Sequence, residues 1–452
     1  MNHRTNRREF LRRTAITGAG VCLAASGMAA EQKPAPKPRP SVPPSERINI
    51  GLVGSGGRGR ANLGGVLGDP GVNIVALCDV NESAFGGAIK AVEAAWEGPC
   101  KARCYSDWRK MLEQKDIDAV IVSTPDHHHA LASVAAMELG KHVYCEKPVA
   151  HSVHEARTVR ETYNRAKVAT QMGTQIHAGD TYRRVVELIR AKAIGEVKEV
   201  HVWCTRVGRP EGTTRPAETP EVPKNLDWDL WLGPAPERPY HPSYLGGCTV
   251  WEQWWDFGNG CLGDMGSHLI DLPFWALDLR QPTTVEAEGA YRSDETYPQW
   301  LTARWEHPAT PKRPGLTLTW YDGGKFPPSP PGIDLTKWGI GVLFVGENGY
   351  LVADYGKKVL LPEDKFKDFT PPAESIPKSA GHYREWLNGC RTGGPTLCNF
   401  DYSGMLVEHN LLGAVAFRVG KKLTWDAENM QAAGCPEADR YIRRPYRKGW
   451  TI

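Results

Sequence analysis

Apolar runs of strand length alternate with helical stretches between residues 48 and 170. Four such runs occur, at residues 48–53, 74–78, 118–125 and 142–148. A helical stretch begins near Arg60, and another runs over residues 126–140. Strands that alternate with helices in this way predict a parallel sheet with crossover helices. We therefore expect residues 48–170 to form a Rossmann domain with a doubly wound parallel sheet.

The pattern changes after residue 170. Three later segments alternate like half-buried strands, namely residues 196–204, 317–321 and 341–345. Two segments have helical character, within residues 173–195 and over residues 382–420. We expect residues 171–430 to form a second α/β domain with an open, largely antiparallel sheet. Residues 431–452 form a C-terminal tail for which the sequence predicts no structure.

A tryptophan-rich region lies inside this second domain. Its members are Trp228, Trp231, Trp251, Trp254 and Trp255. Aromatic rings stack on the apolar C–H faces of sugars, but they also pack under long loops. The sequence leaves these two alternatives open.

The first thirty residues have the features of an export signal in the right order. Residues 6–11 read Asn-Arg-Arg-Glu-Phe-Leu, as in a twin-arginine motif, and an apolar stretch follows over residues 15–30. This stretch is too short and too rich in glycine for a stable membrane span. The alternative is a basic N-terminus with a short buried helix. We expect residues 1–30 to be a twin-arginine signal peptide that sends the folded protein to the periplasm.

A proline-rich arm follows the signal. Residues 31–47 contain six prolines and no apolar periodicity. Such a segment is extended and polyproline-like rather than a domain. It is either a plain spacer, which the sequence favours, or an arm that lies along a neighbouring subunit.

Composition and charge exclude several classes of function. The 452 residues are 41% hydrophobic and 24% charged, as in a soluble globular protein of two domains. The formal charge is +3, but residues 1–30 hold five arginines and one glutamate, which leaves −1 for the rest. A nearly neutral chain lacks the basic face that a nucleic acid partner requires. The eleven cysteines include no C-x-x-C pair, and Cys100 and Cys104 lack a second pair, so we expect no metal site.

A glycine loop follows the first predicted strand. Residues 54–59 read Gly-Ser-Gly-Gly-Arg-Gly, the G-x-G-x-x-G pattern of dinucleotide-binding domains. Asp79 ends the second strand, where a carboxylate binds the ribose hydroxyls of NAD and repels the 2′-phosphate of NADP. We therefore expect NAD as cofactor and NADP as the less favoured one, although Arg58 and Arg60 lie near the loop.

Three consecutive histidines, His127, His128 and His129, open the helix after the third strand. Successive helical residues point about 100° apart, so the three side chains cannot face one metal ion. We expect His129 to lie near the cofactor and His127 and His128 to be exposed.

The order of four motifs resembles the glucose-fructose oxidoreductase, inositol dehydrogenase and rhizopine-catabolism family (Gfo/Idh/MocA). These motifs are the glycine loop, Ser-Thr-Pro-Asp-His-His-His-Ala from residue 123, Cys-Glu-Lys-Pro from residue 145 and Gly-Asp-Met-Gly-Ser-His-Leu-Ile-Asp from residue 263. The resemblance extends from about residue 48 to residue 430. It implies a nicotinamide cofactor, a carbohydrate substrate and a homo-oligomer, dimer or tetramer, formed through the open sheet.

The resemblance also implies the residues of the site. Lys147, Asp264 and His268 are the expected catalytic residues. The expected cofactor-binding residues are Gly54, Gly56, Gly57, Arg58, Gly59, Asp79, Thr124, Pro125, His129, Glu146 and Lys147. Weaker candidates for the substrate pocket are Gln175, His177, Trp254 and Trp255.

The chemistry of alcohol oxidation fits these three catalytic residues. Asp264 and His268 are spaced i, i+4 and share one face of a helix, although a capping aspartate and a packing histidine would have the same spacing. His268 has an ordinary pKa near neutrality and suits a general base. Lys147 can stabilise the developing charge on the reacting oxygen, and Asp264 can orient the His268 ring or bind a neighbouring hydroxyl.

Three functions remain at this point. The favoured one is an NAD(P)-dependent oxidoreductase that transfers a hydride between a nicotinamide and a hydroxyl of a sugar, cyclitol or glycoside. The alternative is an exported NAD-dependent glycoside hydrolase that works by transient C3 oxidation and elimination. A non-catalytic NAD-binding sensor ranks last, because it has no need of Lys147, Asp264 and His268 together.

Overall fold

The computed structural model describes residues 42–452. The predicted signal peptide and residues 31–41 of the arm lie outside the described residues and stay predictions. The end of the arm differs from the extended chain that we expected, because Pro44–Glu46 form a short 3-10 helix. Arg391 donates a hydrogen bond of 3.1 Å from Nε to the carbonyl of Glu46 and so attaches this turn to the folded chain.

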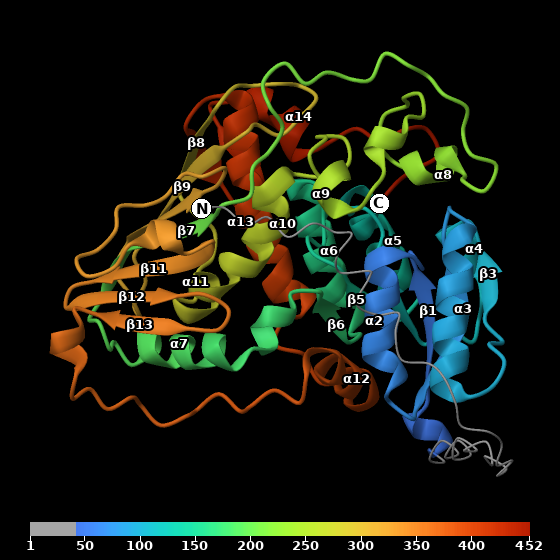
Figure 1. Ribbon diagram of the computed structural model, residues 1–452, viewed down its shortest axis with the longest axis horizontal. Coiled ribbons are helices and arrows are strands. Elements are labelled where there is room, and N and C mark those ends of the chain that lie inside the picture. The colour runs from blue at the N-terminus through green and yellow to red at the C-terminus, as the bar shows by residue number, and fades with distance from the viewer. Residues whose placement is uncertain (1–41) are drawn as a thin grey trace, which may run out of the picture. The chain divides into compact units, whose positions relative to one another are not determined.

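A six-stranded parallel sheet forms the first half of the fold (Figure 1). Its strands, in spatial order, are β3 (Arg103–Tyr105), β2 (Val72–Cys78), β1 (Ile48–Val53), β4 (Ala119–Val122), β5 (His142–Cys145) and β6 (Thr170–Met172). Helices α2 (Gly57–Leu67), α3 (Ser83–Trp96), α4 (Trp108–Leu112), α5 (Asp126–Glu138) and α6 (Val153–Ala166) connect them. The doubly wound sheet is the one that the apolar runs predict, so this part of the fold is confirmed.

Buried side chains cover both faces of the parallel sheet. Ile50 and Leu52 belong to the apolar cluster on one face, together with residues of α2 and α3. Val120 and Val122 belong to the larger cluster on the other face, with residues of α5 and α6. Neighbouring residues of a strand point to opposite faces, which explains why successive positions of these runs are apolar instead of alternating with polar ones.

A nine-stranded mixed sheet forms the second half. Its order is β13 (Lys358–Leu361), β12 (Gly349–Ala353), β11 (Ile340–Gly346), β7 (Val197–Cys204), β10 (Leu316–Tyr321), β9 (Leu301–His307), β8 (Thr284–Gly289), β14 (Leu423–Asp426) and β15 (Gln431–Ala433). Only β7 and β10 pair in parallel among these strands. The expectation of an open, largely antiparallel sheet is therefore confirmed.

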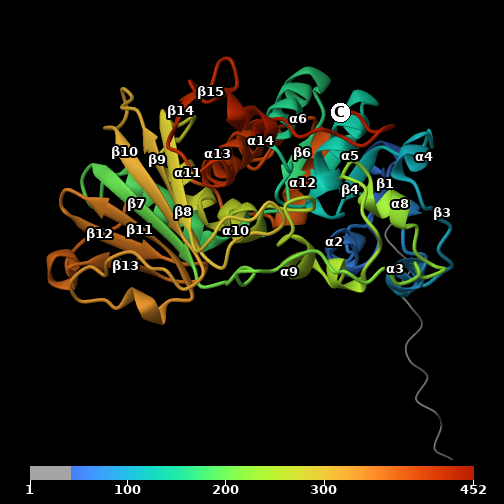
Figure 2. The ribbon, with the colours of Figure 1, turned by 90° about the horizontal axis from the view of Figure 1, so that it is seen from above.

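Two late helices tie the sheets together. Helix α13 (Phe400–Val419) contacts α6 as well as β8 and β9, as Figure 2 shows. Trp386 and Leu387 of α12 (His382–Thr392) are buried in the same cluster as Ile50 of β1. The chain thus returns to the Rossmann domain after the first seven strands of the second sheet and before β14 and β15, which a boundary at residue 170 does not anticipate.

Further short elements complete the chain. The α-helices are α7 (Asp180–Arg190), α8 (Trp228–Leu232), α9 (Cys248–Trp251), α10 (Gly260–Leu269), α11 (Asp271–Ala276) and α14 (Asp439–Ile442). The other 3-10 helices are η2 (Gln175–Ala178), η3 (Pro242–Tyr244), η4 (Leu335–Lys337), η5 (Glu363–Phe366) and η6 (Pro436–Ala438). No helix of residues 42–452 is long and apolar enough to cross a membrane.

The tryptophan-rich region packs on the start of α5. Trp228 and Trp231 stack with ring centroids 4.7 Å apart, and Trp231 also contacts the ring of His127. His127 and His128 are therefore buried, at 0% and 4% exposure, so the expectation that they are exposed is wrong. The Nε2 atoms of both rings lie within hydrogen-bond distance of the Trp231 carbonyl, at 2.9 and 3.1 Å.

Candidate active site and cofactor cavity

The glycine loop joins β1 to α2 at the carboxyl edge of the parallel sheet. Gly54 has a φ of +85°, which a side chain rarely adopts. A Cβ at Gly59 would lie 1.8 Å from the carbonyl oxygen of Gly54, so the turn itself requires glycine there. These two glycines are therefore needed for the fold, and not only for a ligand.

Gly56 is different, because no protein atom requires a glycine at this position. Its φ is −88°, and the nearest atom to an added Cβ is the Cβ of Ala84 at 3.5 Å, which is ordinary contact. In the G-x-G-x-x-G pattern the second glycine lets the backbone approach a pyrophosphate. The loop thus has open space at the place where a dinucleotide comes closest to the backbone, and its geometry fits NAD.

The Asp79 carboxylate lies against this loop. It accepts hydrogen bonds from the backbone N–H groups of Ser55 at 2.8 Å, Gly56 at 3.2 Å and Asn81 at 2.9 Å. Burial raises the pKa of Asp79, although these three hydrogen bonds act in the opposite direction. A carboxylate has about four acceptor sites, so one remains for a ribose hydroxyl.

A cavity of about 530 Å³ runs along this edge of the sheet. The predicted residues that line it are Gly54, Gly56, Gly57, Arg58, Asp79, Thr124 and Pro125. Segments outside the Rossmann domain complete its wall, namely Leu230–Trp231, residues 245–248, Trp251 and Trp450. The cavity therefore has a floor that the glycine motif predicts and a cover that it does not.

His129 lies beneath this cavity and does not line it. Its Nδ1 lies 2.6 Å from the carbonyl of Pro148, and its Nε2 lies 2.8 Å from the carbonyl of Thr124. The ring is 1% exposed and joins the turn after β4 to the turn after β5. His129 thus holds the floor of the site in place.

Glu146 connects the glycine helix to the crossover between the domains. Its Oε1 accepts hydrogen bonds from Arg58 Nε at 2.9 Å, Asn62 Nδ2 at 3.0 Å and Gln175 Nε2 at 3.2 Å. The negative charge of Glu146 raises the pKa of the Arg58 guanidinium, although burial opposes this. Gln175 also donates to the hydroxyl of Tyr144 at 2.9 Å, so it braces Glu146 in the structure.

Lys147 follows Glu146 and forms an ion pair with Asp264 of α10. The other oxygen of Asp264 pairs with Arg206, whose guanidinium also lies 3.0 Å from Oε1 of Glu252. Asp264 shares a helix with His268, as the i, i+4 spacing predicts, but its carboxylate is bonded to the two cations and not to the imidazole. The structure therefore assigns the orientation of His268 to another residue.

Thr174 is that residue. Its hydroxyl donates to the carbonyl of Ser267 at 2.7 Å, so its oxygen can only accept from Nδ1–H of His268, which lies 3.0 Å away. This contact fixes the tautomer with a free lone pair on Nε2, the form that a general base needs. Burial, and then the positive charge of Lys147, holds the pKa of His268 well below its usual range and keeps the ring neutral.

Glu252 is a buried carboxyl group beside these residues. It is 1% exposed, its Oε1 accepts from Gln253 Nε2 at 3.0 Å, and its Oε2 has no hydrogen-bond partner. Burial raises the pKa of Glu252 to about 7, although Arg206 and Lys147 act in the opposite direction. The site therefore holds a second carboxyl group that can carry a proton near neutral pH.

The remaining predicted substrate residues are packed away from the cavity. His177 is 1% exposed, donates a hydrogen bond from Nδ1 to the carboxylate of Asp271 at 2.9 Å and stacks on Trp275. Trp254 and Trp255 are 2% and 3% exposed and pack in two different apolar clusters. Neither tryptophan lines the cofactor cavity, whereas Trp231 and Trp251 do.

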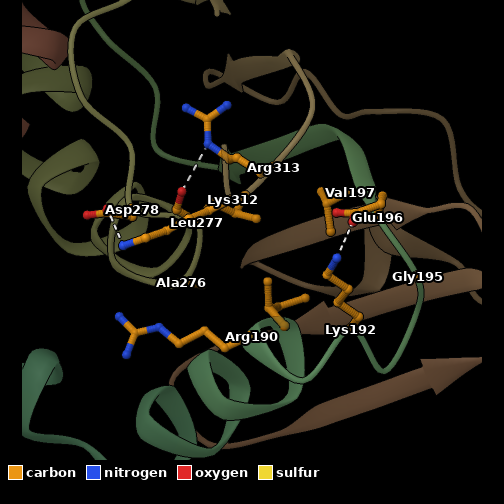
Figure 3. A pocket seen from close by; sticks show the side chains of 11 residues that line it. Arg190, Lys192, Gly195, Glu196, Val197, Ala276, Leu277, Asp278, Lys312 and Arg313 are labelled. Carbon is orange, nitrogen blue, oxygen red and sulfur yellow. Dashed lines mark hydrogen bonds and ion pairs between the residues drawn. The ribbon is translucent and has the colours of Figure 1, made fainter. Parts of the chain in front are cut away.

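A second hollow of about 480 Å³ lies between α7, β7 and residues 276–278 (Figure 3). Its charged side chains bind one another or backbone groups: Lys192 pairs with Glu196, and Arg313 donates from Nε to the carbonyl of Leu277 at 3.0 Å. No residue of the predicted catalytic set lines it. It also lacks the glycine loop and Asp79, which line the first cavity.

One group of possible metal ligands occurs among residues 42–452. Ligand atoms of Cys248, Glu252 and Asp264 lie within 4.8 Å of one another. Asp264 pairs with Lys147 and Arg206, and Glu252 lies 3.0 Å from Arg206, so both carboxyl groups already have cationic partners. The expectation of no metal site stays a prediction.

Sequence reasoning missed Arg206, Glu252, Thr174 and Trp450 as residues of the site. Arg206 lies two residues beyond β7, Glu252 follows α9, and Trp450 lies in the tail. None belongs to a motif with a fixed spacing, and each reaches the site through a contact between distant segments. Only the position of Thr174, just after β6, gives a signal, because side chains that follow parallel strands gather at one edge of the sheet.

Comparison with known families agrees with the glycine loop and both sheets. Residues 48–174 match the NAD-binding Rossmann fold of the Gfo/Idh/MocA oxidoreductase family, and residues 210–308 match its C-terminal alpha/beta domain, together half of the chain. The chain belongs to the Gfo/Idh/MocA oxidoreductase family. The predicted resemblance and the predicted NAD-binding Rossmann domain are thus confirmed.

Individual relatives cover parts of the chain. A glycosyl hydrolase family 109 protein of Shewanella pealeana is 30% identical over 203 residues, 42% of this chain and 44% of that protein. An alpha-N-acetylgalactosaminidase of Shewanella oneidensis is 28% identical over 205 residues, 43% of this chain and 45% of that protein. The chain thus matches less than half of the length of either relative.

Solved structures show the same fold over most of the chain. The WlbA dehydrogenase of Bordetella pertussis, solved with NADH and UDP-GlcNAcA, is 18% identical with a TM-score of 0.57. The similarity covers 84% of this chain and 99% of that structure. At this identity the likeness concerns the fold alone.

Proposed function

We propose that this protein is an NAD-dependent oxidoreductase that oxidises a hydroxyl group of a sugar, cyclitol or glycoside. The observation that carries this proposal is that Lys147, just after strand β5 of the parallel sheet, forms an ion pair with Asp264, and that Asp264 shares helix α10 with the neutral His268. Membership of the Gfo/Idh/MocA family supports it. A sensor that only binds NAD would not need a neutral histidine with a fixed tautomer beside a charged lysine.

The residues divide the work of proton transfer. Bound NAD supplies a hydride acceptor. Nε2 of His268 takes the proton of the substrate hydroxyl, because Nδ1 is bonded to Thr174. Lys147 donates a hydrogen bond to the same oxygen and stabilises its developing negative charge. Asp264 orients Lys147 through their ion pair, and Arg206 pairs with the second oxygen of Asp264.

The test of this function begins with the purified full-length protein. Extraction should release NAD, and a panel of sugars, cyclitols and glycosides should include compounds that reduce the bound cofactor to NADH. A protein that binds no nicotinamide dinucleotide, or a folded His268→Ala variant with full activity, would rule the proposal out.

A second candidate is hydrolysis of a glycoside through transient oxidation. Two observations favour it: the names of the Shewanella relatives and the presence of Glu252 beside Asp264. Elimination needs a second proton-transfer group, because the departing glycosidic oxygen must receive a proton while the oxidised carbon activates the neighbouring C–H bond. A protonated Glu252 suits that role.

Product analysis separates the two candidates. A hydrolase releases the aglycone of an aryl glycoside without net formation of NADH, and Glu252→Gln should stop this release while oxidation of a free sugar continues. A simple dehydrogenase accumulates NADH and leaves the glycosidic bond intact.

We also propose that the protein is exported to the periplasm by the twin-arginine route. The support is the Arg7-Arg8 pair before an apolar run. Replacing both arginines by lysine should keep the protein in the cytoplasm. Normal export of the double variant would exclude this route.

We propose that the protein forms a homo-oligomer, a dimer or a tetramer, through the open sheet. The side chains of Arg304 and Glu199 stand on the face opposite to α13, where a second copy could cover them. Light scattering of the purified protein gives the mass directly. A monomer at micromolar concentration would contradict this proposal.

A further inference from the structure

The last residues of the chain are fixed against the Rossmann domain by specific bonds. Arg444 donates to the carbonyl of His127 at 2.7 Å and to Oε1 of Glu155 at 2.8 Å. Arg447 donates from Nε to the carbonyl of Gly233 at 3.0 Å. The C-terminus accordingly lies by α5 and α8 in Figure 1. This tail lies outside both segments that match the family.

Trp450, near the end of this tail, lines the cofactor cavity. The guanidinium carbon of Arg109 lies 4.1 Å from its ring centroid, and the ring of Trp108 lies 6.0 Å away. His128 meets it edge to face at 5.4 Å. Trp450 is 7% exposed, so its neighbours hold the ring in one place while part of it faces the cavity.

The strand order shows which end of a dinucleotide would lie at Trp450. Lys147 follows β5, the glycine loop follows β1, Asp79 follows β2, and residues 106–108 follow β3. These strands lie in the order β5, β4, β1, β2, β3 across the sheet. With the reacting end at Lys147, the pyrophosphate at the loop and the ribose at Asp79, the base end falls beyond Asp79, where Trp108 and Trp450 meet.

We propose that Trp450 is a binding residue for the adenine ring of NAD, so that the C-terminal tail forms one wall of the cofactor site. This inference rests on the proposed function. Every base has a π face, so the aromatic wall provides affinity for the base without reading its hydrogen-bonding edge. It also makes release of the cofactor depend on a segment far from the glycine loop in sequence.

The test measures how tightly each half of the cofactor, adenosine monophosphate or nicotinamide mononucleotide, binds to the full-length protein after bound nucleotide has been removed. Trp450→Ala should weaken the binding of adenosine monophosphate by about 5- to 150-fold, the range for removal of an aromatic partner of a base. Binding of nicotinamide mononucleotide should stay within about twofold, because its site lies at Lys147. Trp425→Ala is the matched control, since Trp425 is 6% exposed and lies in β14.

Each result has one meaning. If the native protein binds neither NAD nor adenosine monophosphate, the proposed function fails. If the native protein binds both and Trp450→Ala binds adenosine monophosphate equally well, only the role of Trp450 fails. Trp450→Phe keeps an aromatic face and should restore most of the affinity.

A measurement on the native chain covers the case in which Trp450→Ala does not fold. Photolabelling with 8-azidoadenosine monophosphate, followed by peptide mapping, should modify a peptide from residues 444–452, and excess NAD should prevent it. If the labelling that NAD prevents occurs only in peptides outside this tail, the inference is wrong.

Discussion

The hydroxyl oxygen of Thr174 lies 3.0 Å from Nδ1 of His268, and the same hydroxyl donates its hydrogen bond to the carbonyl of Ser267. A threonine that can only accept selects one tautomer of the imidazole. The base at this site is therefore prepared by a residue of the domain crossover, since Thr174 follows β6 whereas His268 belongs to α10.

Thr174→Val should reduce turnover by about 10- to 100-fold, which corresponds to the ~1.5–3 kcal/mol of a hydrogen bond to a group that becomes charged. The substitution keeps the shape of the side chain and removes the acceptor. Thr396→Val is the control, because Thr396 is also buried and donates to a carbonyl, that of Thr170. Equal turnover of the two variants would show that the tautomer is not set by Thr174.

His268→Ala should reduce turnover by about 10²- to 10⁴-fold, the usual contribution of a positioned acid–base group. NAD affinity should change little, because the glycine loop and Asp79 are untouched. His409→Ala is the matched control for a packing histidine, since His409 is fully buried between aromatic rings of the second domain. It should lower the melting temperature and leave turnover per folded molecule nearly intact.

Lys147→Ala should also reduce turnover by about 10²- to 10⁴-fold, and the Lys147→Ala/His268→Ala double variant should lose less than the product of the single losses. The reason is that both groups act on one substrate oxygen. Steady-state kinetics on the three variants measure this coupling. Fully multiplicative losses would mean that Lys147 and His268 act on different atoms.

Glu252→Gln should change how stability depends on pH. The pKa of Glu252 is about 7 in the folded protein, above the ordinary value of 4.5. Between these two pH values the folded chain keeps a proton that the unfolded chain has released, so the stability due to this group falls as pH rises. The melting temperature of Glu252→Gln, relative to the native protein, should therefore increase from about pH 5 to about pH 8. The exposed Glu363→Gln variant should show no such trend, and a flat difference for Glu252→Gln would show that Glu252 is ionised throughout.

Gly56→Ala and Gly59→Ala should differ in what they damage. At Gly56 the added Cβ meets no protein atom closely, so stability should change by less than about 1 kcal/mol while NAD affinity falls by about tenfold or more. At Gly59 the Cβ meets the carbonyl of Gly54, so the fold itself should be destabilised. Thermal melting and NAD titration on both variants decide this. An unchanged NAD affinity in Gly56→Ala would show that the pyrophosphate does not bind close to the backbone at this glycine.

Asp79→Ala should narrow the preference for NAD over NADP. The native carboxylate repels a 2′-phosphate, and its loss also frees the backbone N–H groups of Ser55 and Gly56. Titration of both cofactors into each protein gives the ratio of affinities. Tighter binding of NADP by the native protein would reverse the assignment of the cofactor.

The elements that the sequence predicts well are those with a local signal. The strands at residues 48–53 and 142–145 are apolar apart from Asn49 and His142 because both faces of the sheet are covered. The i, i+4 pair Asp264 and His268 needs only a helix to share a face. Three strands of the second sheet, β7, β10 and β11, follow from alternation in the same way.

The features that escaped prediction depend on contacts between distant segments. His127 and His128 are polar and begin a helix, yet the Trp231 segment and Trp450 bury them. Asp264 turns to Lys147 and Arg206 because these cations approach from two other elements. No pattern along the chain carries such information, since the partners are brought together only by the completed fold.

Trp386 and Trp450 also determine when, during synthesis, the core of the Rossmann domain and the wall of the cofactor cavity can be completed. Trp386 supplies part of the core beneath the glycine helix and Trp450 supplies part of the cavity wall, yet both are synthesised after all six strands of the parallel sheet. A nascent chain that has made only the parallel sheet has an exposed apolar face and an open nucleotide groove. The wall of the groove can thus be completed only after Trp450 has been synthesised.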